Sequence, residues 1–378
     1  MTRLIVGNLD CELSWAGHGS ALPAPVARRV SALATLLRGF ADDGDRLWTP
    51  QPVAIERLPA FVGAPRIELV SGRLSEHNHA AGGNLLLWGA TIAAASQATS
   101  ASPNMKATDV VVHGWRAAPW RLGVANPTAA HQGNDRRLAL AVASSLGAAL
   151  PGARVIDDVT ALRAHLAAGG ADASGGAWVV KAPVTAAGRD RARGSGGRVD
   201  GEAEAATHRL LARFGALIFE PWCSRQEDFA CCGIVTGDGG NPGDVTVAAP
   251  HRLLVDSRGG FRGVSIDDDG AGAGLGDGQR ARLAEAATAA GRALGALGYR
   301  GPFGVDAFGW RDAAGVEHFH PLCEINARLT FGWVARAWSE RLGEPLALHV
   351  GRRPPPNGAR LLLTPSGGDD TTAWITPS

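Results

Sequence analysis

The sequence predicts an α/β protein with more than one domain. At 378 residues, the chain is long enough for two or three domains that each bury a core. Short runs of β-branched and aromatic residues alternate with segments of helical periodicity along most of the chain. Near the C-terminal end, residues 303–328 have the pattern of a β-hairpin that carries several polar side chains. We therefore expect an N-terminal α/β domain, further α/β parts and a site on this hairpin.

The composition argues against several classes of partner. The chain has a formal net charge of +1, with 45% apolar and 19% charged residues. Because this balance is that of an ordinary globular protein, we expect neither nucleic acid nor a membrane surface as a partner. Asp10 and Glu12 come too early for a signal peptide, and no apolar run reaches membrane-spanning length. The five cysteines contain no Cys-x-x-Cys pair, which favours reduced thiols and a cytoplasmic location.

The first region, residues 1–133, has the pattern of an α/β domain. Its expected strands are 4–9, 85–88 and 109–113, and its expected helix is 25–39. Two segments rich in Gly, Pro and polar residues, 41–53 and 71–84, are expected to be loops. His77 and His79 in the second loop are either a metal-binding pair or, as we favour, solvated side chains. No glycine fingerprint for phosphate follows these strands, so the region predicts no chemistry of its own.

The second region opens with a helix that is expected to begin at Asn134, a favourable N-cap. Arg136 and Arg137 lie in its first turn. A strand at 153–156, a helix at 158–168 and a strand that ends at Lys181 are expected to follow. Only two of the 37 basic residues are lysines, at positions 106 and 181. A lysine kept in such a chain is expected where a compact ammonium is needed, although its stem could also simply cover a sheet edge.

Residues 185–198 combine small residues with four arginines and are expected to form a loop. The backbone around Gly188 and Arg189 could close over a polyphosphate through its N–H groups and the positive charge nearby. The same composition would also suit a basic hairpin tip. The segment is therefore a candidate phosphate-binding loop.

A carboxylate ends the next expected strand, 216–219, which follows a helix at 202–212. The strand leads into Glu220, Pro221 and Trp222, and Glu227 comes seven residues after Glu220. The remaining expected elements are strands at 228–235, 245–248 and 251–256, a glycine- and acid-rich connection at 259–269, and a helix at 277–297.

The hairpin brings polar groups together. Strands are expected at 303–310 and 316–326, and Asp306 and Glu324 each lie nine residues from Gly315, so they should face each other. Because side chains alternate along a strand, Glu324, Asn326 and Arg328 should share one face. Two carboxylates and an amide oxygen are ligands that suit Mg²⁺. The alternative is a solvated face with a surface ion pair.

This order of motifs resembles the ATP-grasp family, which includes D-alanine–D-alanine ligase, biotin carboxylase and the carbamoyl phosphate synthetases. The resemblance covers residues 134–335 and rests on a strand lysine, a Gly/Arg loop, a strand ending in Glu, a second Glu, and a hairpin with Asp and Glu-Ile-Asn-x-Arg. It implies an α+β ATP-grasp architecture. An N-terminal α/β domain, 1–133, would precede two subdomains, 134–222 and 223–350, that clamp a nucleotide. The Pro/Gly-rich tail, 351–378, is expected to wrap the surface.

The resemblance also implies roles for single residues. The nucleotide would be bound by Lys181, Gly188, Arg189, Glu220, Pro221, Trp222 and Glu227, with the adenine at 220–222 and the ribose at Glu227. Asp306, Glu324 and Asn326 would hold one or two Mg²⁺, or Mn²⁺ in their place. Arg328 would steady the transferred phosphate or the acyl intermediate. Family members often carry a lysine in the helix that matches 135–147, so Arg137 or Arg136 would take that part here.

The implied reaction is ATP-dependent activation of a carboxylate as an acylphosphate, which an amine or a thiol attacks, so the expected partners are small molecules. Three alternatives stay open at this point. The fold could bind ATP without catalysis, or it could be a phosphotransferase. His318 and His320, which would share the face of Glu324 on an alternating strand, could instead bind a transition metal. The sequence predicts neither the substrates nor the oligomeric state.

Overall fold

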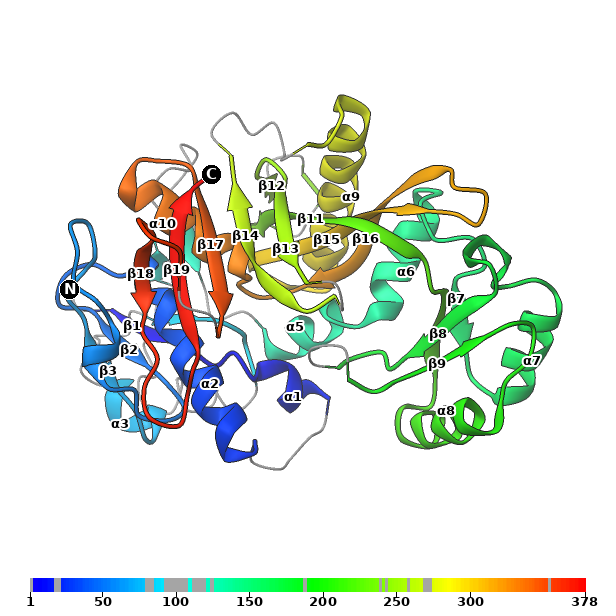
Figure 1. Cartoon of the computed structure of the whole chain (residues 1–378), viewed down its shortest axis with the longest axis horizontal. Coiled ribbons are helices and arrows are strands. Elements are labelled where there is room, and N and C mark those ends of the chain that lie inside the picture. The colour runs from blue at the N-terminus through cyan, green and yellow to red at the C-terminus, as the bar shows by residue number, and fades with distance from the viewer. Residues whose placement is uncertain are drawn as a thin grey trace.

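The structure is a computed structural model, and it describes residues 3–16, 22–78, 85–91, 108–110, 120–122, 126–185, 189–237, 240–241, 244–256, 259–267, 274–352 and 355–378. Three larger sheets and one two-stranded sheet organise these residues (Figure 1). A parallel sheet lies at one end, a small antiparallel sheet lies at the other, and a large antiparallel sheet fills the middle. No helix in these ranges is both long enough and apolar enough to cross a membrane.

The N-terminal sheet is parallel, with the strand order β3-β2-β1-β4. Its strands are β1 (Leu4–Val6), β2 (Arg46–Trp48), β3 (Glu68–Val70) and β4 (Leu85–Leu87). The helical elements here are α1 (Cys11–Trp15), α2 (Ala24–Ala34), η1 (Thr35–Phe40), η2 (Ile55–Arg57) and α3 (Leu74–Asn78), and β5 (Thr108–Val110) pairs with β6 (Trp120–Leu122). The expected loops at 41–53 and 71–84 are wrong in part, because β2 and α3 lie in them.

The possible histidine pair of this region is described only in part. His77 Nε2 lies 2.7 Å from the carbonyl of Ser71, and Arg46 Nη1 donates to the carbonyl of His77 at 3.0 Å. His79 lies outside the described residues. The contacts of His77 are those of a side chain that ties α3 to β2.

The small sheet is antiparallel, with the order β7-β10-β8-β9. Its strands are β7 (Arg154–Ile156), β8 (Ala177–Lys181), β9 (Arg191–Ser195) and β10 (Leu217–Pro221), and it is accompanied by α7 (Val159–Ala167), η4 (Asp172–Ser174) and α8 (Gly201–Phe214). Trp178, Val180 and Phe219 are buried on one face, against the helices. Because strand side chains alternate, Lys181 and Glu220 project from the other face.

The expected loop at 185–198 is shorter than predicted. Residues Arg191–Ser195 form β9, in which Arg191 pairs with Lys181 and Arg193 pairs with Val179. Alternation of a small buried residue, Ala192, with charged neighbours is a strand pattern that the glycine content of the segment concealed. The connection between β8 and β9 therefore carries only Arg189 of the four arginines.

The large sheet runs in the order β16-β15-β11-β13-β14-β17-β19-β18, with β12 paired to β11. Its strands are β11 (Ser224–Val235), β12 (Val245–Val247), β13 (His251–Val255), β14 (Phe261–Ile266), β15 (Gly301–Arg311), β16 (Glu317–Asn326), β17 (Leu346–Gly351), β18 (Arg360–Leu363) and β19 (Thr372–Pro377). Helix α9 (Asp277–Ala296) packs with α6 (Arg136–Ser145) on one face, and α10 (Phe331–Leu342) packs on the other. The expected connection at 259–269 is thus largely a strand, β14.

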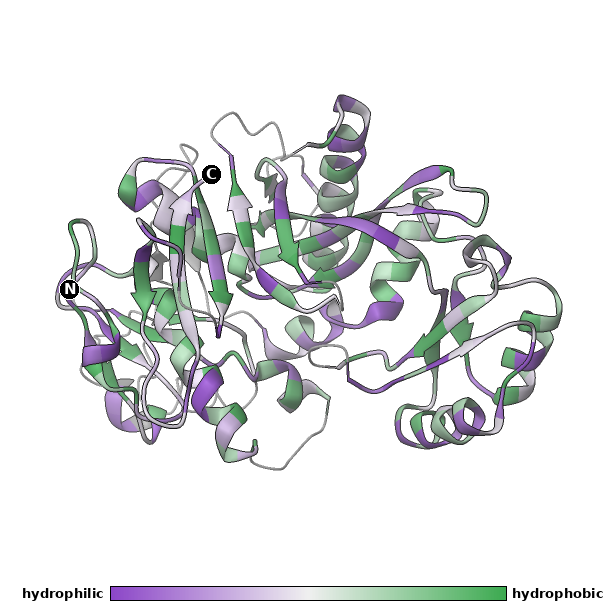
Figure 2. Ribbon diagram, viewed as in Figure 1, coloured by the Kyte–Doolittle hydropathy of each residue, from purple (hydrophilic) through white to green (hydrophobic). Residues whose placement is uncertain are grey.

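The C-terminal tail belongs to this sheet, so the expectation that it wraps the surface is wrong. Strands β18 and β19 bury Leu362, Leu363, Ala373 and Ile375 in the same core as α10 and η1. Figure 2 shows β18 as largely green ribbon, whereas β19 is pale along most of its length. Arg57 Nη1 pairs with Asp369 Oδ2 at 2.8 Å, which ties the tail to the N-terminal region. Residues 357 and 358 form a turn shortly before β18.

Candidate active site

The hairpin of β15 and β16 pairs Asp306 with Glu324, as predicted. The route to this pairing differs from the expected one. At the tip, Arg311 pairs with Glu317, which places the centre of the turn one residue before Gly315. The register then shifts, because residues 306–308 of β15 face residues 320–324 of β16. This β-bulge restores the pairing of the two carboxylates.

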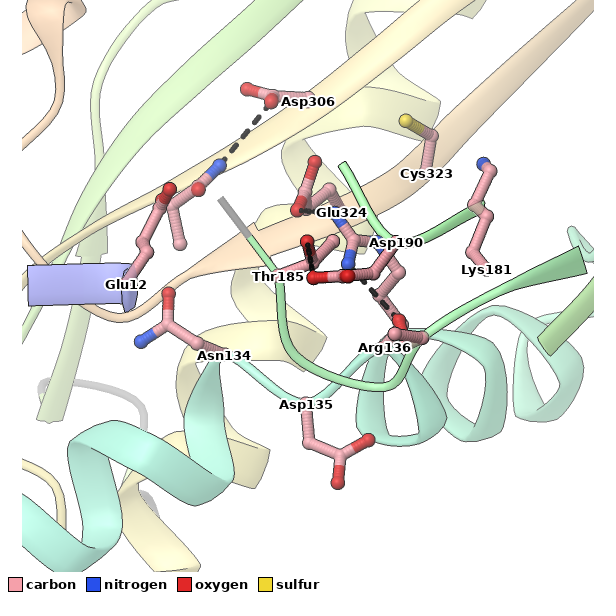
Figure 3. Close-up of polar contacts among 12 residues, drawn as sticks. Glu12, Asn134, Asp135, Arg136, Lys181, Thr185, Asp190, Asp306, Cys323 and Glu324 are labelled. Carbon is pink, nitrogen blue, oxygen red and sulfur yellow. Dashed lines mark hydrogen bonds and ion pairs between the residues drawn. The ribbon is translucent and has the colours of Figure 1, made fainter. Parts of the chain in front are cut away.

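The two carboxylates form a pair that needs a cation or a proton. Burial, and then the neighbouring Glu324, raise the pKa of Asp306 to about 7, against the opposing effects of Arg328 and Asn326. Asn326 Nδ2 donates to Asp306 Oδ2 at 3.2 Å (Figure 3). No group of three or more His, Cys, Asp or Glu side chains suited to a metal ion occurs among the described residues. The oxygen donors present here fit Mg²⁺, whose remaining positions are commonly filled by phosphate oxygens and water.

Arg136 approaches this pair from the first turn of α6. Its Nη2 donates to Glu324 Oε1 at 2.6 Å, and its Nη1 donates to the carbonyl of Ala182 at 3.2 Å. Its backbone N–H donates to the carbonyl of Pro183 at 2.8 Å. Arg136 therefore joins the carboxylate pair to the chain that follows β8, on the small sheet.

Arg137 does not face the carboxylate pair, although it was one of the two arginines expected to bind the nucleotide. Its guanidinium pairs with Asp135 at 2.5 Å, and its side chain is 51% exposed. The reason is a different helix start: Asp135, and not Asn134, caps α6 by accepting from Arg137 N at 2.8 Å. Asn134 ends the preceding helix, α5 (Pro127–Gly133), and accepts from the backbone N–H of Ala327 at 3.2 Å.

Arg328 is held by a residue that the sequence analysis missed. Its Nε donates to Glu12 Oε1 at 2.9 Å, its Nη2 contacts the same oxygen, and Nη2 also donates to Asn326 Oδ1 at 3.0 Å. The guanidinium carbon lies 5.5 Å from the ring centroid of Trp88. Glu12 comes from α1 and Trp88 follows β4, so the N-terminal domain contributes to the site. No sequence signal marks a pairing between residues 316 positions apart.

Lys181 and Glu220 form an ion pair on the face of the small sheet opposite Trp178 and Phe219, and both side chains are largely buried. Burial alone would raise the pKa of the Glu220 carboxyl, but the charge and hydrogen bond of Lys181 outweigh it, so the net shift is downward. Pro221 ends β10, and Trp222, which follows it, is 36% exposed. The guanidinium of Arg193 lies 3.7 Å from the Trp222 ring centroid. An anion in this position would meet Lys181 and the exposed arginines of β9.

The remaining candidates lie on the large sheet and in the connection between β8 and β9. Glu227 of β11 is half-exposed and pairs with Arg252 of β13. Arg189 is exposed, and Gly188 lies outside the described residues. Thr185 Oγ1 donates to Asp190 Oδ2 at 3.0 Å, and Asp190 has a positive φ of 49°, which places a tight turn before β9.

The two hairpin histidines make contacts of their own. His318 stacks on Trp310, with centroids 4.5 Å apart, and its Nε2 lies 2.8 Å from Asp312 Oδ2. His320 is buried, and its Nδ1 donates to the carbonyl of Ala148 at 2.9 Å. The bulge between them and Glu324 breaks the strict alternation that the sequence analysis assumed. These contacts favour structural roles over a transition-metal site.

His320 should make the stability of the protein depend on pH. Burial lowers its pKa to about 4, with Glu220 opposing. The unfolded chain therefore binds a proton at a higher pH than the folded chain, and stability falls as the pH drops through this interval. We expect a loss on the order of 2 kcal/mol between pH 7 and pH 5 from this residue. In denaturant unfolding, His320→Gln should lose less free energy of unfolding between pH 7 and pH 5 than the wild type. His208→Gln, which changes an exposed histidine, should lose as much as the wild type. An equal dependence of the free energy of unfolding on pH in all three proteins would contradict this prediction.

A small antiparallel sheet bearing Lys181, facing a large antiparallel sheet bearing a carboxylate pair, defines the ATP-grasp fold, and this chain has that fold. Solved structures agree over the whole chain. N5-carboxyaminoimidazole ribonucleotide synthetase of Thermus thermophilus is 17% identical, with a TM-score of 0.51 over 100% of this chain and 94% of that one. Biotin carboxylase of Campylobacter jejuni is 12% identical, with a TM-score of 0.54 over 100% and 87% of the two chains.

A third structure holds ligands. The biotin carboxylase domain of 2-oxoglutarate carboxylase from Hydrogenobacter thermophilus, in complex with MgADP, ADP and bicarbonate, is 12% identical, with a TM-score of 0.54 over 99% of this chain and 85% of that one. At these identities the likeness is one of fold. No protein-family profile matches the sequence, and no curated protein matches it significantly.

Proposed function

We propose that the chain is an ATP- and Mg²⁺-dependent ligase that activates a carboxylate as an acylphosphate for attack by an amine or, less often, a thiol. The observation that carries this proposal is the convergence of a partly buried carboxylate pair, Asp306 and Glu324, with cationic groups from three parts of the chain. Arg136 comes from α6, Arg328 follows β16, and Lys181 ends β8. A structure with the same fold holds MgADP and bicarbonate, which supports the assignment.

In this proposal the nucleotide lies between the small and the large sheet. Lys181, Arg136 and the backbone around Gly188 and Arg189 bind the phosphates. Residues 220–222 receive the adenine, and Glu227 exchanges its pairing with Arg252 for the ribose hydroxyls. Asp306, Glu324 and Asn326 hold one or two Mg²⁺, or Mn²⁺. When bound, the metal neutralises charge on the phosphate oxygens.

The side chains contribute to the reaction mainly by positioning the reactants and stabilising charge. The substrate carboxylate oxygen attacks the γ-phosphorus, the bond to the β,γ-bridging oxygen breaks, and ADP leaves. Lys181 and Arg328 stabilise the negative charge that develops on the transferred phosphoryl group. The amine next attacks the acyl carbon and expels inorganic phosphate. Glu12 holds Arg328 in the orientation required for the first step.

Titration with ATP and Mg²⁺ tests the nucleotide site. A ligand at 100 times its Kd should raise the free energy of unfolding by about 2.7 kcal/mol. We expect this stabilisation in the wild type but not in Lys181→Ala. The control variant Arg198→Ala, which changes an exposed residue beyond β9, should be stabilised as the wild type is. Thermal-shift and calorimetric titrations of the three proteins provide the measurement. Binding in the wild type justifies screening carboxylates and amines for ADP release, and no response to ATP would remove the ligase proposal.

A further inference from the structure

A cavity lies outside the site described above. It has a volume of about 530 Å³, which falls in the range of small-molecule pockets. The turn 147–151, two residues of α9 and the hairpin tip line it, and none of Lys181, Glu220, Asp306 or Glu324 does. We call it the hinge pocket, because the turn 147–151 joins α6, which packs on the large sheet, to β7 of the small sheet.

The hinge pocket touches both halves of the molecule. Ala173 of η4 lines the pocket from the side of the small sheet. Trp310 of β15 and Arg282 of α9 line it from the side of the large sheet. Beneath it, Leu150 and Trp310 pack in one small core with Phe308 and Cys223. A molecule bound here would therefore contact both sides of the connection between the sheets.

The lining defines the chemistry of a ligand. The stacked rings of Trp310 and His318 lie 24° apart and offer a flat aromatic wall. The two acidic side chains of the lining already have partners: Asp312 pairs with His318, and Glu317 pairs with Arg311. Arg282, in contrast, forms no ion pair with any described residue. A planar ring with one negative charge therefore complements this lining.

We propose that the hinge pocket binds a small planar aromatic anion, a carboxylate or a phosphate, and that its occupancy changes the affinity of the nucleotide site. A chain of contacts joins the two sites. His320 lines the pocket and donates to the carbonyl of Ala148, and its ring packs edge-on against Phe308 at 5.1 Å. The guanidinium of Arg225 lies 3.9 Å from the Phe308 ring centroid. Arg225 follows Trp222 at the start of β11, next to the expected adenine position.

Binding is tested first without any nucleotide, so that its outcome does not depend on the proposed ligase function. Indole-3-carboxylate, phenyl phosphate and neutral indole serve as probes in calorimetric titrations. At least one anion should bind, and neutral indole should bind at least tenfold more weakly. Arg282→Glu should lose the anion, whereas Arg292→Glu, an exposed arginine on the same helix outside the lining, should bind it as the wild type does. The anion with the lower Kd identifies the ligand as carboxylate or phosphate.

Coupling is tested next by titrating ATP and Mg²⁺ with and without the bound anion. The Kd for the nucleotide should change at least fivefold in the wild type and not in Arg282→Glu. Failure of both anions to bind the wild type would refute the pocket. Equal binding by Arg282→Glu would refute the assigned contact, and an unchanged nucleotide Kd with a saturated pocket would refute the coupling. If ATP itself does not bind, the ligase proposal fails while the binding result stands.

Discussion

Glu324→Gln is expected to lower kcat by at least about 10²–10³-fold while the protein stays folded. Glutamine keeps the shape of Glu324 and can still accept the hydrogen bond of Arg136, which is 2.6 Å away. What it removes is one of two negative charges at the place where the proposed Mg²⁺ is held. The loss should therefore fall on the phosphoryl transfer step and on the affinity for Mg²⁺. ADP release and a calorimetric titration with MgADP provide the two measurements.

The same hairpin offers a matched control. Glu317 lies seven residues earlier on β16, its side chain is 72% exposed, and it pairs with Arg311. Glu317→Gln should retain the wild-type rate and affinity, because exposed ion pairs contribute little. Equal thermal midpoints in the two variants would show that folding is not the cause of any difference. Full activity in Glu324→Gln would remove the carboxylate pair from the mechanism.

Arg136→Ala should reduce turnover by a similar factor, about 10²-fold or more. Burial alone would lower the pKa of this guanidinium, but Glu324, Glu220 and Glu12 raise it, so the group stays charged. Arg136 thus interacts electrostatically with a carboxylate of the large sheet, one of the small sheet and one of the N-terminal domain. Without it, Glu324 loses a partner and the phosphates lose a contact from α6. Rates of ADP release and the Kd for ATP should both change.

The neighbouring residue supplies the comparison. Arg137→Ala removes a side chain of the same type from the same helical turn, but one that pairs with Asp135 and is half-exposed. We expect its rate and nucleotide affinity to stay within about twofold of the wild type, since exposed ion pairs are worth less than about 1 kcal/mol. If Arg137→Ala were the more damaging variant, the orientation of α6 in the nucleotide-bound protein would differ from that described here.

The sequence was most informative where local periodicity decides the structure. Equal distance from the assumed turn at Gly315 predicted the facing of Asp306 and Glu324. The true turn lies one residue earlier, and the β-bulge between residues 320 and 324 of β16, which contains Pro321, restores the pairing. The start of α6 could not be predicted to the residue, because Asn134 and Asp135 are both favourable N-caps. A shift of one residue in the helix start decides whether Arg136 or Arg137 points toward the carboxylates. Contacts between distant segments were not predictable, because Glu12 carries no local signal of its pairing with Arg328.

Misassigned elements have a common physical cause. β9 contains glycine and charged residues, and β14 lies between two glycines and a run of aspartates, so composition indicated loops where hydrogen bonding to a neighbouring strand makes a sheet. The tail was misread for the same reason, since the prolines at 354–356 precede β18 and do not interrupt it. Propensity is a weak guide when tertiary pairing stabilises the strand.

The position of β18 and β19 has a consequence for synthesis. Arg38, near the start of the chain, donates to the carbonyl of Leu362 at 3.3 Å, and Trp338 donates to the carbonyl of Leu36 at 3.0 Å. The core around η1 is therefore completed only by segments that are synthesised some 300 residues later. At about 5–20 residues per second, this interval lasts roughly 15–60 s on the ribosome. The N-terminal region therefore emerges with exposed apolar surface that only the end of the chain can cover.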